Sequence, residues 1–151
     1  MDFLASLRRA TPSSQKIGMV GFCWGGRFAL RAALEENMIE VEGEKKPLID
    51  AVVALHPSNL VIPADVEKVV VPSSIGWGVE DQGVSFAQKA QVEDVHALAQ
   101  KAGRKLPEVE HKVYRPGRHG FAVRGNPDDP QERKCMEDSV TQALTWLGRW
   151  L

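Results

Sequence analysis

Residues 16–26 carry the sequence Lys-Ile-Gly-Met-Val-Gly-Phe-Cys-Trp-Gly-Gly, a short apolar run that ends in a cysteine among glycines. The run over 16–21 is typical of a strand buried in a parallel sheet. Residues 27–36 follow with apolar side chains at helical spacing, so the glycine-rich segment joins a strand to a helix. We therefore predict that Cys23 stands on a tight turn between the two.

The pattern Gly-x-Cys-x-Gly around Cys23 is the thiol form of a nucleophile elbow. In such an elbow the nucleophile occupies a strained turn, and the glycines two positions away, here Gly21 and Gly25, allow close backbone packing. The backbone N–H of Trp24 then points at a developing oxyanion, and the helix N-terminus favours a thiolate. The alternative is an ordinary turn with a buried cysteine, since glycines are common at such junctions.

The rest of the chain alternates between strand and helix patterns. We predict helices over 3–10, 27–36, 85–102 and from Pro130 onward, and strands over 16–21, 49–55, 69–77 around Pro72, and 108–115. Asp128 or Asp129 is expected to cap the last helix. The alternation predicts an α/β protein with a parallel sheet of about four strands flanked by helices, in a single domain over residues 1–151.

Composition narrows the class of protein further. The 151 residues include 43% hydrophobic and 26% charged residues, with a net charge of −1, which fits a globular chain and does not suggest a nucleic-acid partner. We expect no membrane segment, because no apolar stretch approaches the roughly 18 residues that a span needs. The first residues lack the features of a signal peptide. Two cysteines form no disulfide framework and no Cys/His cluster has zinc spacing, so we expect a cytoplasmic protein without metal or cofactor.

Two later loops carry groups that could assist a nucleophile. His119 lies in a glycine-bounded loop just after the last predicted strand, where a side chain can reach a nucleophile on a neighbouring strand. An acid is expected between Cys23 and His119, because α/β-hydrolases have the chain order nucleophile, acid, base. Asp81 fits that position, and Glu80 is its rival.

Other residues near these loops are weaker candidates for binding a substrate. His56 ends the second predicted strand and either lines the same cleft or has a structural role with Pro57 and Ser58. Trp77 adjoins the proposed site. Arg124, five residues after His119, is a candidate for binding a substrate carboxylate. Cys135 is expected to pack in the final helix, and His96 and His111 receive no role.

Together these motifs resemble the dienelactone hydrolase family, and its fungal-type branch most. The resemblance rests on the segment 21–26, the loop 78–81, and His119-Gly-Phe-Ala followed by Arg124, and it extends over nearly all of the chain. It implies that Cys23 is the nucleophile, His119 the base and Asp81 the acid that orients it. It also implies that Trp24 supplies an oxyanion N–H and that Arg124 contacts a substrate carboxylate.

The chain departs from the family pattern in one respect. In a complete α/β-hydrolase fold the elbow follows the fifth of eight strands, whereas Cys23 follows the first predicted strand here. We therefore expect the C-terminal portion of that fold, with roughly 90–100 residues of family pattern absent before Met1 at about 30 residues per βαβ unit. By the resemblance, that part carries the second oxyanion N–H, an acidic residue beside the resting thiol, and another arginine.

The sequence leaves more than one function open. The first hypothesis is a hydrolase of a small carboxylic ester or lactone that acts through a Cys23 acyl-enzyme. The second is a non-catalytic fragment that forms a homo-oligomer or pairs with another chain through an exposed sheet edge. The third is a glutamine-amidotransferase-like enzyme, in which a Glu closely follows the His, whereas Gly-Phe-Ala follows His119 here.

Overall fold

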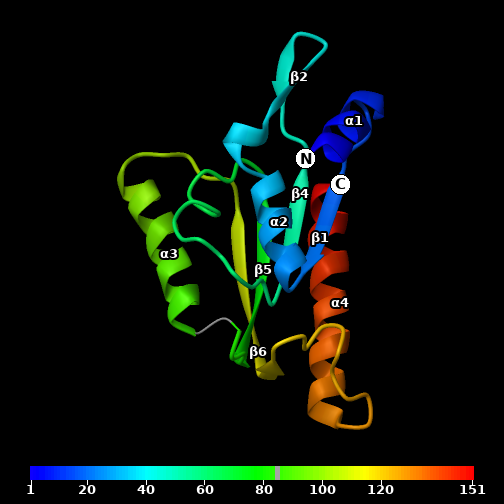
Figure 1. Ribbon diagram of the computed structural model, residues 1–151, viewed down its shortest axis with the longest axis vertical. Coiled ribbons are helices and arrows are strands. Elements are labelled where there is room, and N and C mark those ends of the chain that lie inside the picture. Colours follow the sequence, from blue (N-terminus) through cyan, green and yellow to red (C-terminus); the bar gives the residue numbers. More distant parts are fainter. Residues whose placement is uncertain (84–85) are drawn as a thin grey trace.

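The elements of the fold follow the predicted alternation of strands and helices. The computed structural model describes residues 1–83 and 86–151, so Ser85, where the third predicted helix begins, lies outside the described residues. Figure 1 shows the elements in chain order: α1 Asp2–Ala10, β1 Gly18–Phe22, α2 Trp24–Ala32, η1 Glu35–Asn37, β2 Ile39–Val41, β3 Glu44–Lys46, β4 Ala51–Leu55, β5 Ser73–Glu80, α3 Phe86–Lys101, β6 Val109–Arg118 and α4 Pro130–Trp150.

The main sheet has four strands in the order β1-β4-β5-β6, and each neighbouring pair is parallel. Parallel neighbours need crossover connections, and α2 and α3 lie in two of them. All four strands therefore point the same way, and the loops that follow them gather at one edge of the sheet. The predicted α/β architecture with about four parallel strands is confirmed.

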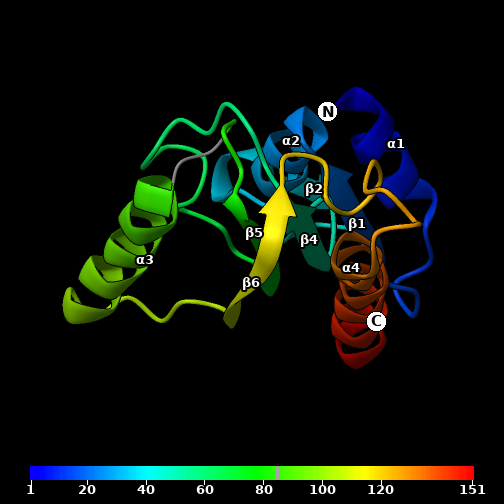
Figure 2. The same cartoon turned by 90° about the horizontal axis from the view of Figure 1, so that it is seen from below.

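Helices cover both faces of the sheet, as the view from below shows (Figure 2). Side chains of β4 alternate between two cores: Val52 and Ala54 pack with α2 and α3, and Val53 and Leu55 pack with α4. Every residue of β4 is consequently buried. This explains the unbroken apolar run over residues 51–55, because a strand covered on both faces has no polar side.

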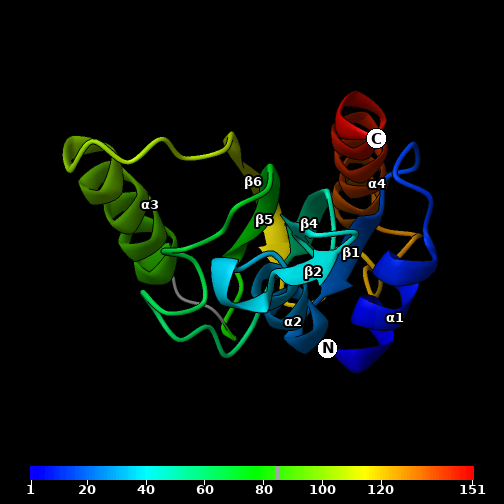
Figure 3. The same cartoon turned by 90° about the horizontal axis from the view of Figure 1, so that it is seen from above.

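Several predicted boundaries shift by two or three residues, and two were wrong by four residues. The second helix ends at Ala32 rather than Glu36, because Leu34 turns into an isolated antiparallel bridge with Val69. The third strand begins at Ser73 rather than Val69, since Pro72 has no N–H to donate and lies before the strand. Residues 37–47, for which we predict no helix or strand, include a small antiparallel hairpin of β2 and β3 that projects at the top of Figure 1 and faces the viewer in Figure 3.

The last helix begins where the sequence predicts. Asp129 is its N-cap, and its carboxylate accepts hydrogen bonds from the backbone N–H groups of Gln131 and Glu132. Pro130 occupies the first turn, where its missing N–H costs nothing. In the described part of the chain, none of the helices has the length and hydropathy of a membrane span.

Candidate active site

Cys23 stands on a strained turn between β1 and α2. Its φ of 54° lies in the left-handed region that β-carbon-bearing residues rarely adopt. Two glycines make room for the turn: a Cβ added to Gly21 would collide with the carbonyl group of Gly25, and one added to Gly26 would lie 3.0 Å from Pro57. A Cβ added to Gly25 itself would meet no atom within 4 Å. The elbow thus needs Gly21 and Gly26, and the expectation that Gly25 also needs to be small was wrong.

His119 and Asp81 complete a chain of hydrogen-bonding groups that begins at the thiol. The Cys23 Sγ lies 2.8 Å from Nε2 of His119, and Nδ1 of the same ring lies 2.9 Å from Oδ1 of Asp81. Asp81 immediately follows β5 and His119 immediately follows β6, while Cys23 follows β1. Because these strands are parallel, their carboxyl ends meet at one edge, and three distant residues come together there.

Asp81, rather than Glu80, is the acid beside the imidazole. The side chain of Asp81 is 2% exposed, and its Oδ1 also accepts a hydrogen bond from the backbone N–H of Gly83. Glu80 is exposed and forms an ion pair with Arg118. Since Nδ1 of His119 faces the Asp81 carboxylate, the imidazole keeps its proton on Nδ1 when neutral and presents Nε2 to the sulfur.

The charges of the site favour a thiolate next to an imidazolium. The hydrogen bond with Ser58 is the main cause that lowers the pKa of Cys23; burial opposes it, and His119 and the backbone N–H of Trp24 add to the lowering. Burial acts to lower the pKa of His119, but its hydrogen bonds with Cys23 and Asp81 outweigh burial and raise that pKa. Both shifts stabilise the charged pair.

Trp24, predicted to supply an oxyanion N–H, directly follows Cys23 in the elbow. It is the first residue of α2, and its backbone N–H points to the sulfur of Cys23. The residue is 59% exposed, and its indole contacts the ring of Phe28 edge-on, at 4.5 Å between centroids. The backbone of Trp24 thus faces the sulfur of Cys23, while its side chain faces outward.

His56 is buried directly behind the elbow. Only 1% of it is exposed, and its Nδ1 accepts a hydrogen bond from the backbone N–H of Cys23. Its ring contacts His119 and Phe121 edge-on. Burial lowers the pKa of His56 to about 4, so the ring is neutral near pH 7. This placement fits the structural role and leaves His56 almost no surface for a substrate.

Trp77 lies apart from Cys23, Asp81 and His119. It is 3% exposed, packs in the core below α2 and α3, and donates a hydrogen bond from its indole N–H to Nδ1 of His111. The structure therefore does not bring Trp77 to the site, because its side chain packs in the core between the sheet and the helices α2 and α3.

Arg124 lies beside His119. A Cβ added at Gly120 would lie 2.7 Å from Nε of Arg124, so the guanidinium covers the backbone next to His119. Arg124 is exposed, and it borders a cavity of about 160 Å³ together with His119, Arg118 and Cys135. A positive charge at this place suits an anionic group on a bound molecule. Cys135 is buried at the cavity wall and its thiol points to the carbonyl oxygen of Arg115.

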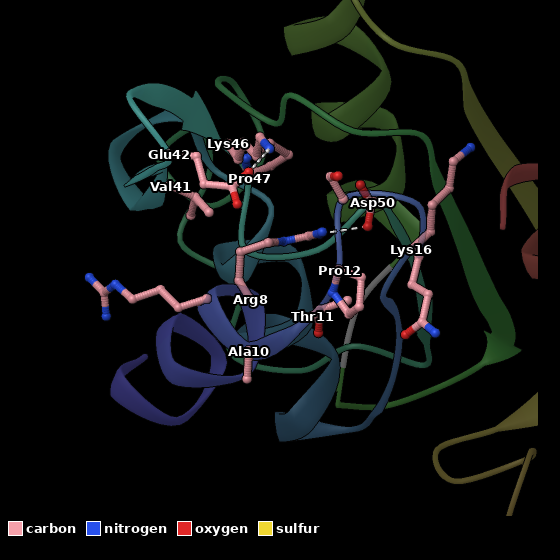
Figure 4. A pocket seen from close by; sticks show the side chains of 13 residues that line it. Arg8, Ala10, Thr11, Pro12, Lys16, Val41, Glu42, Lys46, Pro47 and Asp50 are labelled. Carbon is pink, nitrogen blue, oxygen red and sulfur yellow. Dashed lines mark hydrogen bonds and ion pairs between the residues drawn. The ribbon is translucent and has the colours of Figure 1, made fainter.

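A second pocket, of about 380 Å³, lies at the other end of the strands (Figure 4). Arg8 extends across it to an ion pair with Asp50, which also accepts the backbone N–H of Ile17 just before β1. Lys46 pairs with Glu42 in the hairpin loop. Lys16 donates to the backbone carbonyl oxygen of Trp150. The pocket is separate from the Cys23 site. Within residues 1–83 and 86–151, no three His, Cys, Asp or Glu side chains are placed to hold a metal ion.

The fold, the cysteine elbow and the His–Asp pair define an α/β-hydrolase. The model of the dienelactone hydrolase family matches residues 2–151, and the chain belongs to that family. Hydrolase tropI of Talaromyces stipitatus is 24% identical over 100% of this chain and 52% of its own length. A carboxymethylenebutenolidase homolog of Xenopus tropicalis is 26% identical over 91% of this chain and 50% of its own length. The chain thus spans about half the length of these curated relatives.

Solved structures agree with this fold. A Klebsiella pneumoniae protein assigned as a dienelactone hydrolase superposes with a TM-score of 0.72 at 17% identity, covering 98% of this chain and 58% of that one. A dienelactone hydrolase-like promiscuous phosphotriesterase from metagenomic libraries superposes with a TM-score of 0.63 at 18% identity, covering 97% and 58%. At these identities the likeness concerns the fold.

Proposed function

We propose that this chain hydrolyses small carboxylic esters or lactones through an acyl-enzyme on Cys23. The observation that carries the proposal is the continuous path from the sulfur to Nε2 of His119 and from Nδ1 to Asp81, at 2.8 and 2.9 Å. A thiolate in such contact with a protonated imidazole is the activated form of a cysteine nucleophile. Membership of the dienelactone hydrolase family supports the same substrate class.

The proposed reaction has two steps, formation of a thioester on Cys23 and its hydrolysis. The Cys23 thiolate attacks the carbonyl carbon, and the tetrahedral oxyanion accepts a hydrogen bond from the N–H of Trp24. The C–O bond to the alcohol breaks, His119 gives its Nε2 proton to the leaving oxygen, and a thioester remains. Water then attacks the thioester while His119 takes a proton from it, which releases the acid and returns the thiolate–imidazolium pair. Asp81 holds the ring and stabilises its positive charge.

Initial rates of p-nitrophenyl acetate hydrolysis test this function. We expect Cys23→Ala to reduce the rate to the uncatalysed background and His119→Ala to reduce it strongly, because acyl transfer begins at the thiolate and the proton needs a carrier. Cys135→Ala is the matched control, since its thiol lies outside the reacting path, and it should keep the parent rate. Circular dichroism checks that each variant folds. A Cys23→Ala variant with the parent rate would refute the proposal.

A second candidate function is association with another chain through the edge of β1. Among the described residues, β1 pairs with one strand only, β4, and the side chain of Phe22 at its end is 39% exposed. An open strand edge is a template for a further strand. Light scattering coupled to size-exclusion chromatography distinguishes the two: a monomer that hydrolyses the ester in a Cys23-dependent way excludes association as the basis of its function.

A further inference from the structure

The loop after β4 wraps around the elbow. Residues 56–59 follow β4, which lies next to β1 in the sheet. His56 and Asn59 both have left-handed backbones, with φ values of 40° and 57°. Such conformations are rare outside glycine and turn the chain sharply. The loop therefore folds back over the residue that follows β1, which is Cys23.

This loop holds the backbone of Cys23 from both sides. The Cys23 N–H donates to Nδ1 of His56 at 3.1 Å, and the carbonyl oxygen of Cys23 accepts the N–H of Ser58 at 3.0 Å. Pro57, between them, lies against Gly26 with no room for a Cβ. The strained turn at Cys23 is thus fixed by contacts that lie outside the elbow itself.

Ser58 adds a contact with the reacting atom. Its Oγ lies 3.5 Å from the Cys23 sulfur, and Ser58 is 8% exposed, so its hydroxyl stays at the thiol rather than in bulk water. We propose that Ser58 is a further functional residue of this site: its hydroxyl donates a hydrogen bond to the Cys23 thiolate and holds the sulfur for attack. The proposal deepens the proposed function and rests on it for the catalytic meaning of the thiolate.

The direction of this hydrogen bond follows from the charge state. A neutral thiol can donate or accept, but a thiolate carries no proton and can only accept. With the thiolate formed, Nε2–H of His119 and Oγ–H of Ser58 both donate to the sulfur. A donor next to an anion stabilises it, and the Ser58 hydrogen bond is the main cause that lowers the pKa of Cys23.

The pH dependence of Cys23 alkylation by iodoacetamide tests this proposal without any ester. For Ser58→Ala we expect the titration midpoint to rise by about one pH unit, with the alkylation rate at pH 7 falling about tenfold, since hydrogen bonds to charged groups are the strong ones. Ser14→Ala is the matched control, because Ser14 is exposed in the segment before β1, at the opposite end of that strand. It should titrate as the parent does.

A second pair of variants separates the hydroxyl from the shape of the side chain. Threonine and valine have nearly the same shape, and only threonine has the hydroxyl. We expect the midpoint of Cys23 alkylation to be lower in Ser58→Thr than in Ser58→Val. If Ser58→Ala does not fold, this pair of variants still tests the proposal. Equal midpoints for Thr and Val, or an unchanged midpoint in Ser58→Ala, would overturn the proposal.

The outcomes for Ser58 and for the proposed function are distinguishable. An unchanged Ser58→Ala midpoint together with loss of ester hydrolysis in Cys23→Ala rejects the role of Ser58 and keeps the hydrolase. A raised midpoint together with ester hydrolysis that does not depend on Cys23 keeps the hydrogen bond and rejects the hydrolase.

Discussion

Nδ1 of His56 accepts a hydrogen bond from the backbone N–H of Cys23, so a ring that is 1% exposed supports the turn that carries the thiol. Only an imidazole with a lone pair on Nδ1 can make this contact. The same N–H also donates to the carbonyl oxygen of Leu55, at 3.1 Å, so the neutral ring of His56 is one of two acceptors that hold the backbone of Cys23. The pKa values of the two histidines shift in opposite directions, since hydrogen bonds with Cys23 and Asp81 raise that of His119 and burial lowers that of His56.

Acid should weaken the folded state through His56. Its pKa is about 4 when folded and 6.5 for the free side chain, so below pH 6.5 the unfolded chain binds a proton that the folded chain does not. Stability from this group is complete above pH 6.5 and is lost as the pH falls toward 4. By linkage the loss is on the order of 2–3 kcal/mol at pH 4.5.

The variant His56→Asn isolates this contribution. Asparagine tolerates a left-handed backbone and offers an oxygen acceptor, but it does not titrate. Urea unfolding of the parent and of the variant at pH 7 and at pH 4.5 measures how much stability each protein loses between these two pH values. We expect the variant to lose less than the parent by about 2 kcal/mol. Equal losses would show that His56 is protonated with its ordinary pKa in the fold.

The two cysteines should differ in reactivity. At neutral pH, Cys23 has a lowered pKa and Cys135 is 4% exposed within the packing of α4, so brief treatment with iodoacetamide should label Cys23 first. Peptide mapping after the reaction measures both sites in one sample. Labelling of the two at the same rate in folded protein would contradict an activated thiol.

The neighbouring acids Asp81 and Glu80 form a matched pair for mutation. Asp81→Asn should reduce the rate of ester hydrolysis strongly, yet by roughly 50–100-fold less than loss of the nucleophile, as in a serine hydrolase with the same arrangement. Glu80→Gln removes a charge one residue away, at an exposed ion pair with Arg118, and should change the rate little. Initial rates with p-nitrophenyl acetate measure both. If Glu80→Gln reduced the rate more than Asp81→Asn does, Glu80 and not Asp81 would be the acid.

Gly21 and Gly25 should respond differently to the same substitution. A Cβ on Gly21 would collide with the backbone of Gly25, so we expect Gly21→Ala to lower the free energy of unfolding by about 1–3 kcal/mol or more. Gly25 lies in α2 with open space around it, and Gly25→Ala should be neutral or stabilise by up to about 1 kcal/mol through helix propensity. Urea unfolding compares the two variants directly. Similar losses would show that α2 moves to accept both.

The site was predictable from the sequence where a residue directly follows a strand. Cys23, Asp81 and His119 each do, and parallel strands bring such residues to one edge. Trp77 was not predictable in this way, because β5 is buried on both faces and shows no alternation that would tell which layer its indole enters. The contact of Ser58 with the thiol was missed because it depends on the adjacency of β1 and β4 and on the left-handed backbone at His56. Neither the adjacency of these two strands nor the backbone conformation of His56 can be recognised from the pattern of apolar and polar residues in one sequence.

Arg124 should govern the preference for anionic substrates. Its guanidinium lies over Gly120 beside His119 and is exposed, whereas Arg118 pairs with Glu80 and Glu132. We compare kcat/KM for a p-nitrophenyl ester with a terminal carboxylate with kcat/KM for p-nitrophenyl acetate. We expect Arg124→Met to lower the ratio of the first to the second by about 10–100-fold, because one charge-assisted hydrogen bond is lost. Arg118→Met is the control and should leave that ratio near the parent value, because its charge is already paired. Steady-state rates with the two esters provide the measurement. If both esters lose the same factor in Arg124→Met, the residue acts through the shape of the site and does not bind the carboxylate.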